Sequence, residues 1–336
     1  MRFPISLLLA LNVLGCTNNK TIPEVDHIKI NLSVQRFEQG LFALDTNHLE
    51  PGLDLLLARF PSFGENFLST ILNIDPKWKP DTALNYVKSF IASYRPLYDS
   101  SKILFKNFSP YEEEIKKGLQ FLNYYFPAYK PPTKIITYIG PLDGYGDILD
   151  EDAFIIGLHH HLGKHYSAYK TLWVQETYPN YMSNRFEPEY ISINCMKNIV
   201  TDIYPEKNED KSLVLQMVEK GKKLYMLSKL LPHAPENKLI GYTETQLKDS
   251  YAHEAVIWNL FVQNNFLQTI DNNITKNYIG EGPKTQELGE ASPGNIGSFA
   301  GWQIVKKYMK KFPDTSLKQL METEGEKIFE EAKYKP

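Results

Sequence analysis

Every stretch of this sequence with the pattern of a β-strand lies before residue 185, and only helical patterns follow it. Residues 28–34 alternate apolar and polar side chains, which predicts a strand with one buried face. Two apolar runs, 134–139 and 154–158, flank a loop rich in glycine and aspartate, and we expect them to be neighbouring strands of one sheet. Because strands come first and helices afterwards, the order predicts an α+β fold with a small mixed sheet and a mostly helical C-terminal half.

Apolar residues at helical spacing predict several helices, and prolines and polar turns mark the breaks between them. We expect helices within residues 51–74, 82–98 and 109–125, and further helices over about 187–204, 211–231, 243–268, 294–312 and 315–333. The predicted body is a single domain over residues 28–336. Its sheet-containing part covers about 28–184, and its helical part covers about 185–336.

The N-terminus carries the pattern of a bacterial lipoprotein signal. One arginine and a short apolar segment lead to the run Val13-Leu14-Gly15-Cys16. The segment is too short to span a bilayer, which needs about 20 apolar residues. We therefore expect residues 1–15 to be removed and Cys16 to carry acyl chains such as palmitate, with residues 16–27 as a tether. The alternative is an ordinary secretory signal in which the cysteine is incidental.

The composition is that of a folded body attached to this anchor. Hydrophobic residues make up 42% of the chain and charged residues 23%, as in globular domains. The net charge of −3 argues against a nucleic-acid partner, which would need a basic face on the protein. Cys195 is the one cysteine besides Cys16, so we expect no disulfide within the chain. Its apolar neighbours predict a buried, unreactive thiol.

The loop between the two apolar runs, residues 143–152, is rich in carboxylates. Oxygen ligands suit calcium. However, Tyr145 stands where an EF-hand loop needs an oxygen ligand, and no glutamate occupies the twelfth position. We expect a strand connection with solvated carboxylates, and a calcium-binding loop is the alternative.

Four histidines, His159, His160, His161 and His165, follow the second apolar run. His161 and His165 are four residues apart, the spacing with which a helix presents two imidazoles to one zinc ion. No glutamate stands next to His161, and the intervening Gly163 is typical of a helix end. We predict a solvated turn or polar face here, and a zinc site is the alternative.

His253-Glu254 begins a partial match to the zinc-protease motif HExxH, but Ile257 stands where the second histidine is required. We expect Glu254 to lie on a long amphipathic helix in a structural role. The sequence also lacks a phosphate-binding P-loop and a Gly-x-Ser-x-Gly nucleophile elbow. It therefore predicts no cofactor, no metal and no catalytic residue.

Three glycines, Gly294, Gly297 and Gly301, precede and enter the helix predicted over 294–312. Glycines three and four residues apart let a second element approach the helix backbone closely, because they carry no side chain. We expect a tight packing seam at this helix, and a loop that contacts a ligand is the alternative.

Several segments together resemble the GldB family of gliding-motility lipoproteins of the Bacteroidetes. They occur in the expected order and cover nearly the whole mature chain. They are the lipoprotein signal ending at Cys16 (the lipobox) and residues 36–42, 156–164, 251–268 and 292–305. The last segment, 292–305, is the most specific.

The resemblance implies a layout similar to that of zincin-like metallopeptidases, with a small sheet, an edge strand and then a helical half. The helix predicted over 187–204 would occupy the place of the HExxH helix, but it contains no histidine. Glu254 would lie near the position of the third ligand. Because catalytic zinc is held by about three protein ligands, the resemblance implies a peptidase scaffold without the chemistry.

The leading hypothesis is a lipid-anchored, non-catalytic protein required for gliding motility. It would face the periplasm from the inner or the outer membrane and work with other motility proteins. Two alternatives stay open. One is a membrane-anchored zinc metallopeptidase that uses His161, His165 and Glu254, and the other is a periplasmic lipoprotein whose cleft binds a peptide or a glycan.

Overall fold

The computed structural model describes residues 22–206 and 210–336. Cys16, the signal sequence and the first part of the tether lie outside these residues. Residues 22–32 run along the N-terminal part, where Val25 is fully buried and the Gln120 side chain donates a hydrogen bond to the Ile28 carbonyl (2.9 Å). The predicted strand over 28–34 is displaced, because pairing begins only at Ser33.

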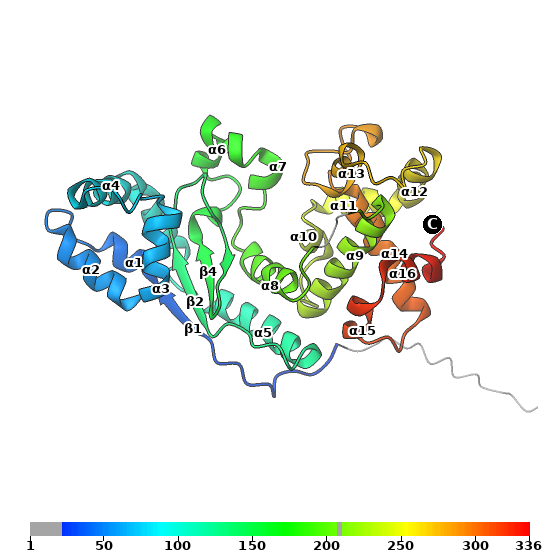
Figure 1. Cartoon of the computed structure of the whole chain (residues 1–336), viewed down its shortest axis with the longest axis horizontal. Coiled ribbons are helices and arrows are strands. Elements are labelled where there is room, and N and C mark those ends of the chain that lie inside the picture. Colours follow the sequence, from blue (N-terminus) through cyan, green and yellow to red (C-terminus); the bar gives the residue numbers. More distant parts are fainter. Residues whose placement is uncertain (1–21, 207–209) are drawn as a thin grey trace, which may run out of the picture.

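A four-stranded sheet forms the centre of the N-terminal part (Figure 1). The first, second and fourth strands pair in parallel, and the short third strand pairs antiparallel with the fourth. The two long apolar strands are neighbours, as predicted, and their continuous apolar character suits strands buried on both faces. In spatial order the strands are β1 (Ser33–Arg36), β2 (Lys134–Tyr138), β4 (Ala153–Gly157) and β3 (Ile148–Leu149).

Helices between β1 and β2 cover the sheet, and their aromatic side chains fill the core beside it. Phe37 is fully buried, and its ring lies 4.8 to 5.2 Å from the rings of Phe60, Phe63 and Phe67. These elements are α1 (Phe37–Phe42), α2 (Leu49–Arg59), α3 (Pro61–Asn66), the π-helical turn η1 (Phe67–Ile71), α4 (Pro80–Leu104) and α5 (Ser109–Tyr125).

After β4 the chain forms short helical turns above the sheet and then the helical half (Figure 1). The short elements are η2 (Leu158–His160), η3 (Ser167–Lys170), α6 (Leu172–Thr177) and α7 (Asn180–Ser183). The helical half comprises α8 (Tyr190–Ile203), α9 (Leu213–Leu230), α10 (Glu236–Ile240), α11 (Glu244–Ala252), α12 (Glu254–Gln263), α13 (Asn272–Ile279), η4 (Gln286–Leu288), α14 (Ile296–Lys311), α15 (Leu317–Glu322) and α16 (Gly325–Ala332). In the described residues no strand follows β4, which confirms the α+β prediction.

Two predicted helices are each divided in the structure. The helix expected over 243–268 is α11 followed by α12, because His253 leaves helical geometry between them (φ −115°, ψ 23°). The helix expected over 315–333 is α15 followed by α16, with Thr323 and Glu324 extended at the junction. The prediction of one long helix around Glu254 was therefore wrong, since Glu254 begins a new helix.

Helices α9 and α14 cross with almost no side chains between their backbones. A Cβ atom on Gly301 would lie 1.7 Å from the Met217 carbonyl oxygen. A Cβ atom on Gly221 would lie 2.2 Å from the Gly301 carbonyl oxygen. Neither approach leaves room for a methyl group. The predicted packing seam is thus confirmed, and Gly221 of α9 is the partner glycine that the sequence did not single out.

Candidate functional site

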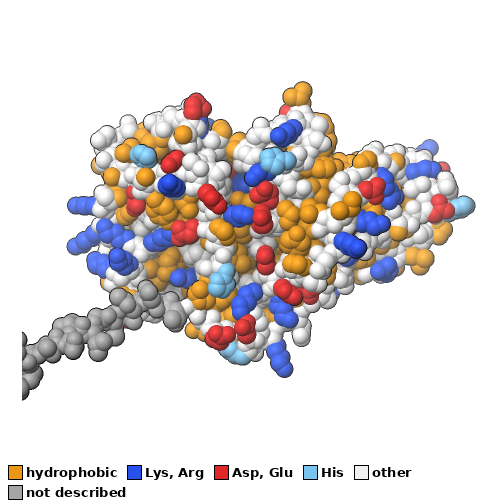
Figure 2. All heavy atoms as spheres, turned by 180° about the vertical axis from the view of Figure 1, so that it is seen from behind, with side chains coloured by type: hydrophobic (Ala, Val, Ile, Leu, Met, Phe, Trp, Pro, Cys, Tyr) orange, Lys and Arg blue, Asp and Glu red, His pale blue; other side chains and the backbone are white. Residues whose placement is uncertain are grey.

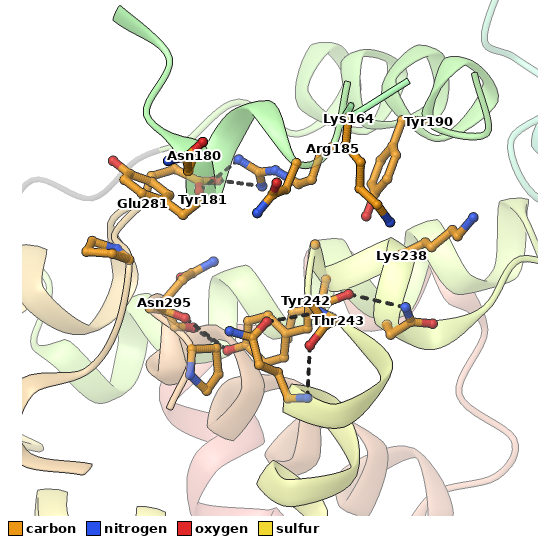
Figure 3. Close-up of a pocket in the computed structure, with 18 of the residues that line it drawn as sticks. Lys164, Asn180, Tyr181, Arg185, Tyr190, Lys238, Tyr242, Thr243, Glu281 and Asn295 are labelled. Atoms are coloured by element: carbon orange, nitrogen blue, oxygen red, sulfur yellow. Dashed lines mark hydrogen bonds and ion pairs between the residues drawn. The ribbon is translucent and has the colours of Figure 1, made fainter. Parts of the chain in front are cut away.

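A cleft of about 1130 Å³ opens between the short helices above the sheet and the C-terminal helices. One wall comes from α7, the link to α8 and the first residues of α8. The other wall comes from α10, α11 and the loop that leads into α14. The two walls face each other across the open space in Figure 3. Within the described part of the chain, the cleft is lined by helices and loops and by no strand.

The wall formed by α7 and α8 carries amide and phenol groups. Asn180 and Asn184 lie one helical turn apart and are exposed, and Tyr181 is half-buried between them. Tyr190 begins α8 and is only 5% exposed, yet it lines the cleft. Burial raises the pKa of Tyr190 to about 12, so its hydroxyl stays protonated. These four residues can therefore offer hydrogen bonds without adding charge to this wall.

The opposite wall is shaped by the turn between α10 and α11. Gly241 ends α10 in the left-handed region (φ 84°), which a residue with a side chain adopts at a cost. Thr243 then starts α11 with a capping box, in which its hydroxyl accepts from the Gln246 backbone amide and the Gln246 side chain accepts from the Thr243 backbone amide. The Tyr242 hydroxyl is shared between the carbonyls of Gly294 and Asn295, at 3.2 Å each, and fixes the loop before α14. Gly294, a seam glycine in the prediction, thus also lines the cleft.

Ion pairs join the two walls. Arg185, before α8, donates two hydrogen bonds to Glu281, after α13, at 3.1 and 3.0 Å. Lys238 of α10 contacts Glu189 at 2.9 Å. A third pair, Lys164 with Glu187 (3.4 Å), lies at the wall formed by α8.

Gly241 also lets Arg185 reach across the cleft. A Cβ atom there would lie 2.8 Å from the Arg185 guanidinium. Figure 2, which views the molecule from behind, shows acidic and basic side chains interleaved over the hollow between the two parts. The charges of the cleft are therefore largely matched within the protein.

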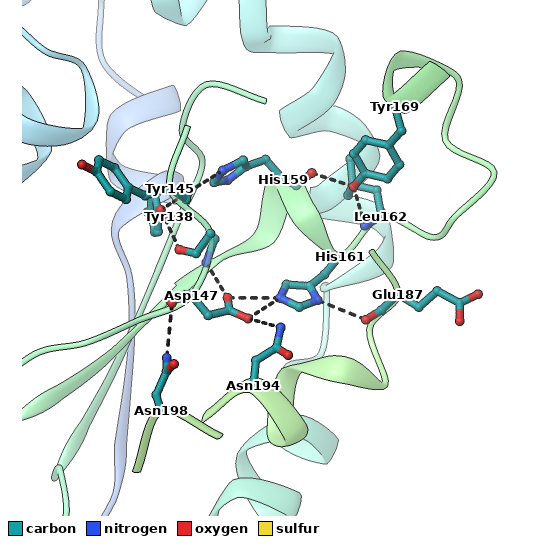
Figure 4. A network of polar contacts seen from close by, with 12 residues as sticks. Tyr138, Tyr145, Asp147, His159, His161, Leu162, Tyr169, Glu187, Asn194 and Asn198 are labelled. Atoms are coloured by element: carbon teal, nitrogen blue, oxygen red, sulfur yellow. Dashed lines mark hydrogen bonds and ion pairs between the residues drawn. The ribbon is translucent and has the colours of Figure 1, made fainter. Parts of the chain in front are cut away.

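A buried polar network lies beyond the cleft, between β3, β4 and α8 (Figure 4). Its centre is Asp147, whose carboxylate lies 2.8 and 3.1 Å from the His161 Nε2 atom. The carboxylate also accepts from the Asn194 amide (2.8 Å) and the Gly157 backbone amide (3.1 Å). Asn198, one turn along α8, donates to the Asp147 carbonyl (3.2 Å). The side chains of His161 and Asp147 are 1% and 5% exposed.

The geometry fixes the charge state of this pair. The His161 Nδ1 atom faces the Glu187 carbonyl at 3.0 Å, so both ring nitrogens face oxygen acceptors and both carry protons. Burial alone would lower the pKa of His161, but the Asp147 carboxylate outweighs burial and raises it. Burial likewise raises the pKa of Asp147, while His161 and the two amide donors hold it below its usual 3.8. The pair is therefore a buried imidazolium–carboxylate ion pair.

His159 and His160 are buried and neutral, because burial lowers the pKa of His159 well below 6.5 and that of His160 to about 4. The His159 Nδ1 atom accepts from the Gly140 amide (3.1 Å), so its Nε2 donates to the Tyr145 carbonyl (3.0 Å). The His160 Nε2 donates to the Leu142 carbonyl (3.0 Å). Both rings thus hold the loop between β2 and β3 over the end of β4.

The prediction of a solvated turn was wrong for His159, His160 and His161, which are at most 5% exposed. It holds for His165, which is exposed and lines the cleft. The prediction of solvated carboxylates in the loop 143–152 was wrong for Asp147. The physical reason is the same in both cases. The loop folds back over β4, and its carbonyls and the Asp147 carboxylate are satisfied by imidazoles rather than by water.

The three candidate metal ligands are not brought together. Both nitrogens of His161 are engaged in the buried network, and His165 is not on a common helix with it. Glu254 begins α12 at the far end of the helical half (Figure 1), where it accepts a hydrogen bond from the Tyr334 hydroxyl (2.5 Å). Across residues 22–206 and 210–336, no group of three or more His, Cys, Asp or Glu residues is arranged to hold a metal ion.

Helix α8, expected to stand where a zincin carries its HExxH motif, presents Asn194 and Asn198 to the Asp147 loop. Two residues four apart on a helix share one face, and here that face is closed by hydrogen bonds to Asp147. Cys195 between them is buried, as predicted, and burial raises the pKa of its thiol well above 9. The open part of the groove lies at the start of α8, at Tyr190.

Sequence reasoning did not single out the residues of the cleft. The available signal was the polar, aromatic stretch of residues 179–185, which ends at the predicted boundary between the sheet-containing and helical parts. The repeat of asparagine at 194 and 198 in an otherwise apolar helix was a second signal. Both mark places where the two parts meet.

Fold and site define an α+β protein with a polar cleft between a sheet-containing part and a helical part. Residues 18–336 match the family described as "Gliding motility protein GldB", and the chain belongs to that family. The resemblance noted in the sequence is thereby confirmed. No curated protein and no solved structure matches the chain.

Membership of this family makes the chain a gliding-motility protein. Because the family is one of lipoproteins, the chain is also a membrane-associated protein of the cell envelope. Among residues 22–206 and 210–336, none of the helices combines the length and the apolar character that crossing a membrane requires. The zincin-like layout stays a prediction.

Proposed function

We propose that this protein is a lipid-anchored, non-catalytic binding protein of gliding motility, held by Cys16 on a membrane and facing the periplasm. Family membership supports a role alongside other motility proteins. The lipobox supports acylation at Cys16. The observation that carries the binding role is the cleft of about 1130 Å³ at the junction of the two parts, a typical location for ligand sites.

The positions of the candidate ligands support a non-catalytic role. The imidazolium of His161 has no lone pair for a metal, because both of its nitrogens hold protons. Glu254 is held by Tyr334 at the opposite end of the helical half. The carboxylates of Glu187, Glu189 and Glu281 in the cleft are paired with Lys164, Lys238 and Arg185.

The anchor is tested by replacing Cys16→Ser in the native gene. We expect the protein to move from the membrane fraction to the soluble periplasmic fraction, with an unchanged melting temperature and with loss of cell spreading on surfaces. Cys195→Ala is the matched control, since it removes the other cysteine and keeps the anchor. Normal spreading by cells whose Cys16→Ser protein is wholly soluble would overturn the anchoring role.

The motility role is tested by deleting the gene, which should abolish cell spreading and surface movement. The non-catalytic role is tested by elemental analysis of the purified protein, with His165→Ala and Glu254→Gln as variants. We expect no stoichiometric zinc. About one zinc per chain that both variants lose would instead support the metallopeptidase alternative.

A further inference from the structure

We propose that the cleft binds an uncharged oligosaccharide, that is, a segment of a glycan strand. This inference deepens the proposed function and rests on the protein being a binding protein. It names the chemical class of the ligand from the groups that line the cleft.

The charges of the cleft leave no cationic site for an acidic ligand. Within the described part of the chain, every lysine and arginine of the lining is paired with a glutamate, namely Lys164, Arg185 and Lys238 with Glu187, Glu281 and Glu189. The remaining carboxylate, Glu244, lies in the first turn of α11, where the helix dipole favours a negative charge. A phosphate, sulfate or carboxylate ligand would have to break an existing ion pair. The lining therefore favours a ligand without charge.

Polar groups without a protein partner are concentrated on one wall. The side chains of Asn180 and Asn184 make no hydrogen bond to any described residue, although both lie at the cleft. Each amide offers one acceptor and one donor group side by side. Two neighbouring hydroxyl groups of a sugar ring match that pair. Tyr181, between the two amides, offers a partly exposed ring for the apolar face of a sugar.

Tyr190 adds a hydroxyl group to the same wall. It is 5% exposed, but its hydroxyl points into the space between the walls in Figure 3. Among residues 22–206 and 210–336 it has no hydrogen-bond partner. The ring is buried, but the hydroxyl is not among the enclosed polar atoms that lack a partner, so it is open to the cleft. A ligand hydroxyl in the cleft can therefore form a hydrogen bond with Tyr190 without displacing a protein partner.

The same lining argues against a peptide. Peptides that bind in extended form usually pair with the edge of a sheet, and no strand lines the cleft among the described residues. The apolar side chains of a peptide need apolar pockets. Apart from three prolines, Ile240 is the one aliphatic side chain of the lining. The cleft is instead rich in amides and hydroxyls.

The test is isothermal titration of the detergent-solubilised, lipidated protein with four probes. Two are uncharged, an N-acetylglucosamine hexamer and a glucose hexamer with β-1,4 links, and two are comparisons, a sulfated hexasaccharide and penta-alanine. We expect saturable binding of at least one uncharged hexamer and none of the comparison probes. The inference would be overturned if neither uncharged hexamer bound. It would also be overturned if penta-alanine or the sulfated hexasaccharide bound as tightly as the uncharged hexamers.

Variants locate the binding. Tyr190→Phe should weaken binding by about three- to tenfold, the effect of one neutral hydrogen bond, and Asn184→Ala by a similar factor. Tyr124→Phe on α5 and Asn85→Ala on α4 are matched controls, since both residues are exposed and lie outside the cleft. Equal affinity of Tyr190→Phe and wild type would place the sugar elsewhere and overturn the assignment.

Failure of this inference is distinguishable from failure of the proposed function. If no uncharged sugar binds while deletion of the gene still abolishes spreading, the glycan assignment is wrong and the motility role stands. If deletion leaves spreading intact, the motility role is wrong whatever the titrations show.

Discussion

Two ion pairs beside α8 differ in how far they are buried. Near the middle of the helix, Asp147 and His161 form a pair whose side chains are 5% and 1% exposed. Just before its start, Arg185 and Glu281 form a pair whose side chains are 21% and 50% exposed. Buried charges are costly to separate, because each loses water and keeps only its partner. Exposed pairs contribute little, because water and salt replace the partner. The comparison predicts a rigid network behind an adaptable cleft.

The largest effect is expected for Asp147→Ala. The substitution leaves the His161 imidazolium buried without its counter-ion and removes the acceptor for the Asn194 and Gly157 amides. We expect the free energy of unfolding to fall by about 3–5 kcal/mol, measured by urea denaturation at pH 6. Asp143→Ala in the same loop is the control, because Asp143 is exposed, and should change it by less than about 0.5 kcal/mol.

A small loss for Asp147→Ala would contradict the ionic description of the network. In that case His161 would be neutral in the folded protein, and Asp147 would act only as a hydrogen-bond acceptor. The Asp147→Asn variant separates the two descriptions. It keeps the size of the side chain, so a large loss in Asp147→Asn as well would assign the effect to charge.

The pH dependence of stability gives the second test of the buried pair. The pKa of His161 is raised by folding, so its contribution is fully present below the unfolded value of about 6.5 and is lost as the pH rises through the folded pKa. The pKa of Asp147 is lowered, so its contribution is present above about 3.8 and is lost as the pH falls through the folded pKa. The pair therefore stabilises most between these two unfolded values.

The measurement compares wild type with His161→Gln, which removes the titration of His161 and also the cation that lowers the pKa of Asp147. The difference in free energy of unfolding should be largest near pH 5–6 and should shrink above pH 6.5 by at most about 1.4 kcal/mol per pH unit. A difference that grows as the pH rises from 6 to 9 would show that His161 is held neutral.

The sheet, the order of the elements and the packing seam could be predicted from sequence because they follow from local patterns. Continuous apolar runs predicted strands β2 and β4, and the spacing of glycines predicted the close packing at Gly301. The burial of His161 could not be predicted in this way. It depends on the loop that carries Asp147, which is 14 residues away along the chain and folds back over β4. Local polarity predicts exposure for both residues, and a long-range pairing overrides it.

The cleft shows the same limit. Its walls are contributed by residues that are far apart in sequence, such as Arg185 and Glu281, which are separated by 96 positions. Each is an ordinary surface residue by local criteria. The boundary near residue 185 was nonetheless visible in the change from strands to helices, and the cleft opens at that boundary. Sequence predicted where the two parts meet but not which side chains face each other.

The smallest effect is expected at the cleft, and a double-mutant cycle measures it. Arg185→Ala and Glu281→Ala should each lower the free energy of unfolding by under about 1 kcal/mol, with a coupling energy of about 0.2–1 kcal/mol that falls as salt is added. The bidentate geometry places Arg185–Glu281 near the upper end of that range.

A coupling energy of about 3 kcal/mol or more, as large as the loss expected for breaking the buried pair, would mean that the cleft is as rigid as the network behind it. A small, salt-sensitive coupling would mean instead that the walls can separate at little cost. An elongated ligand could then enter between them without disturbing the core that α8 shares with the sheet.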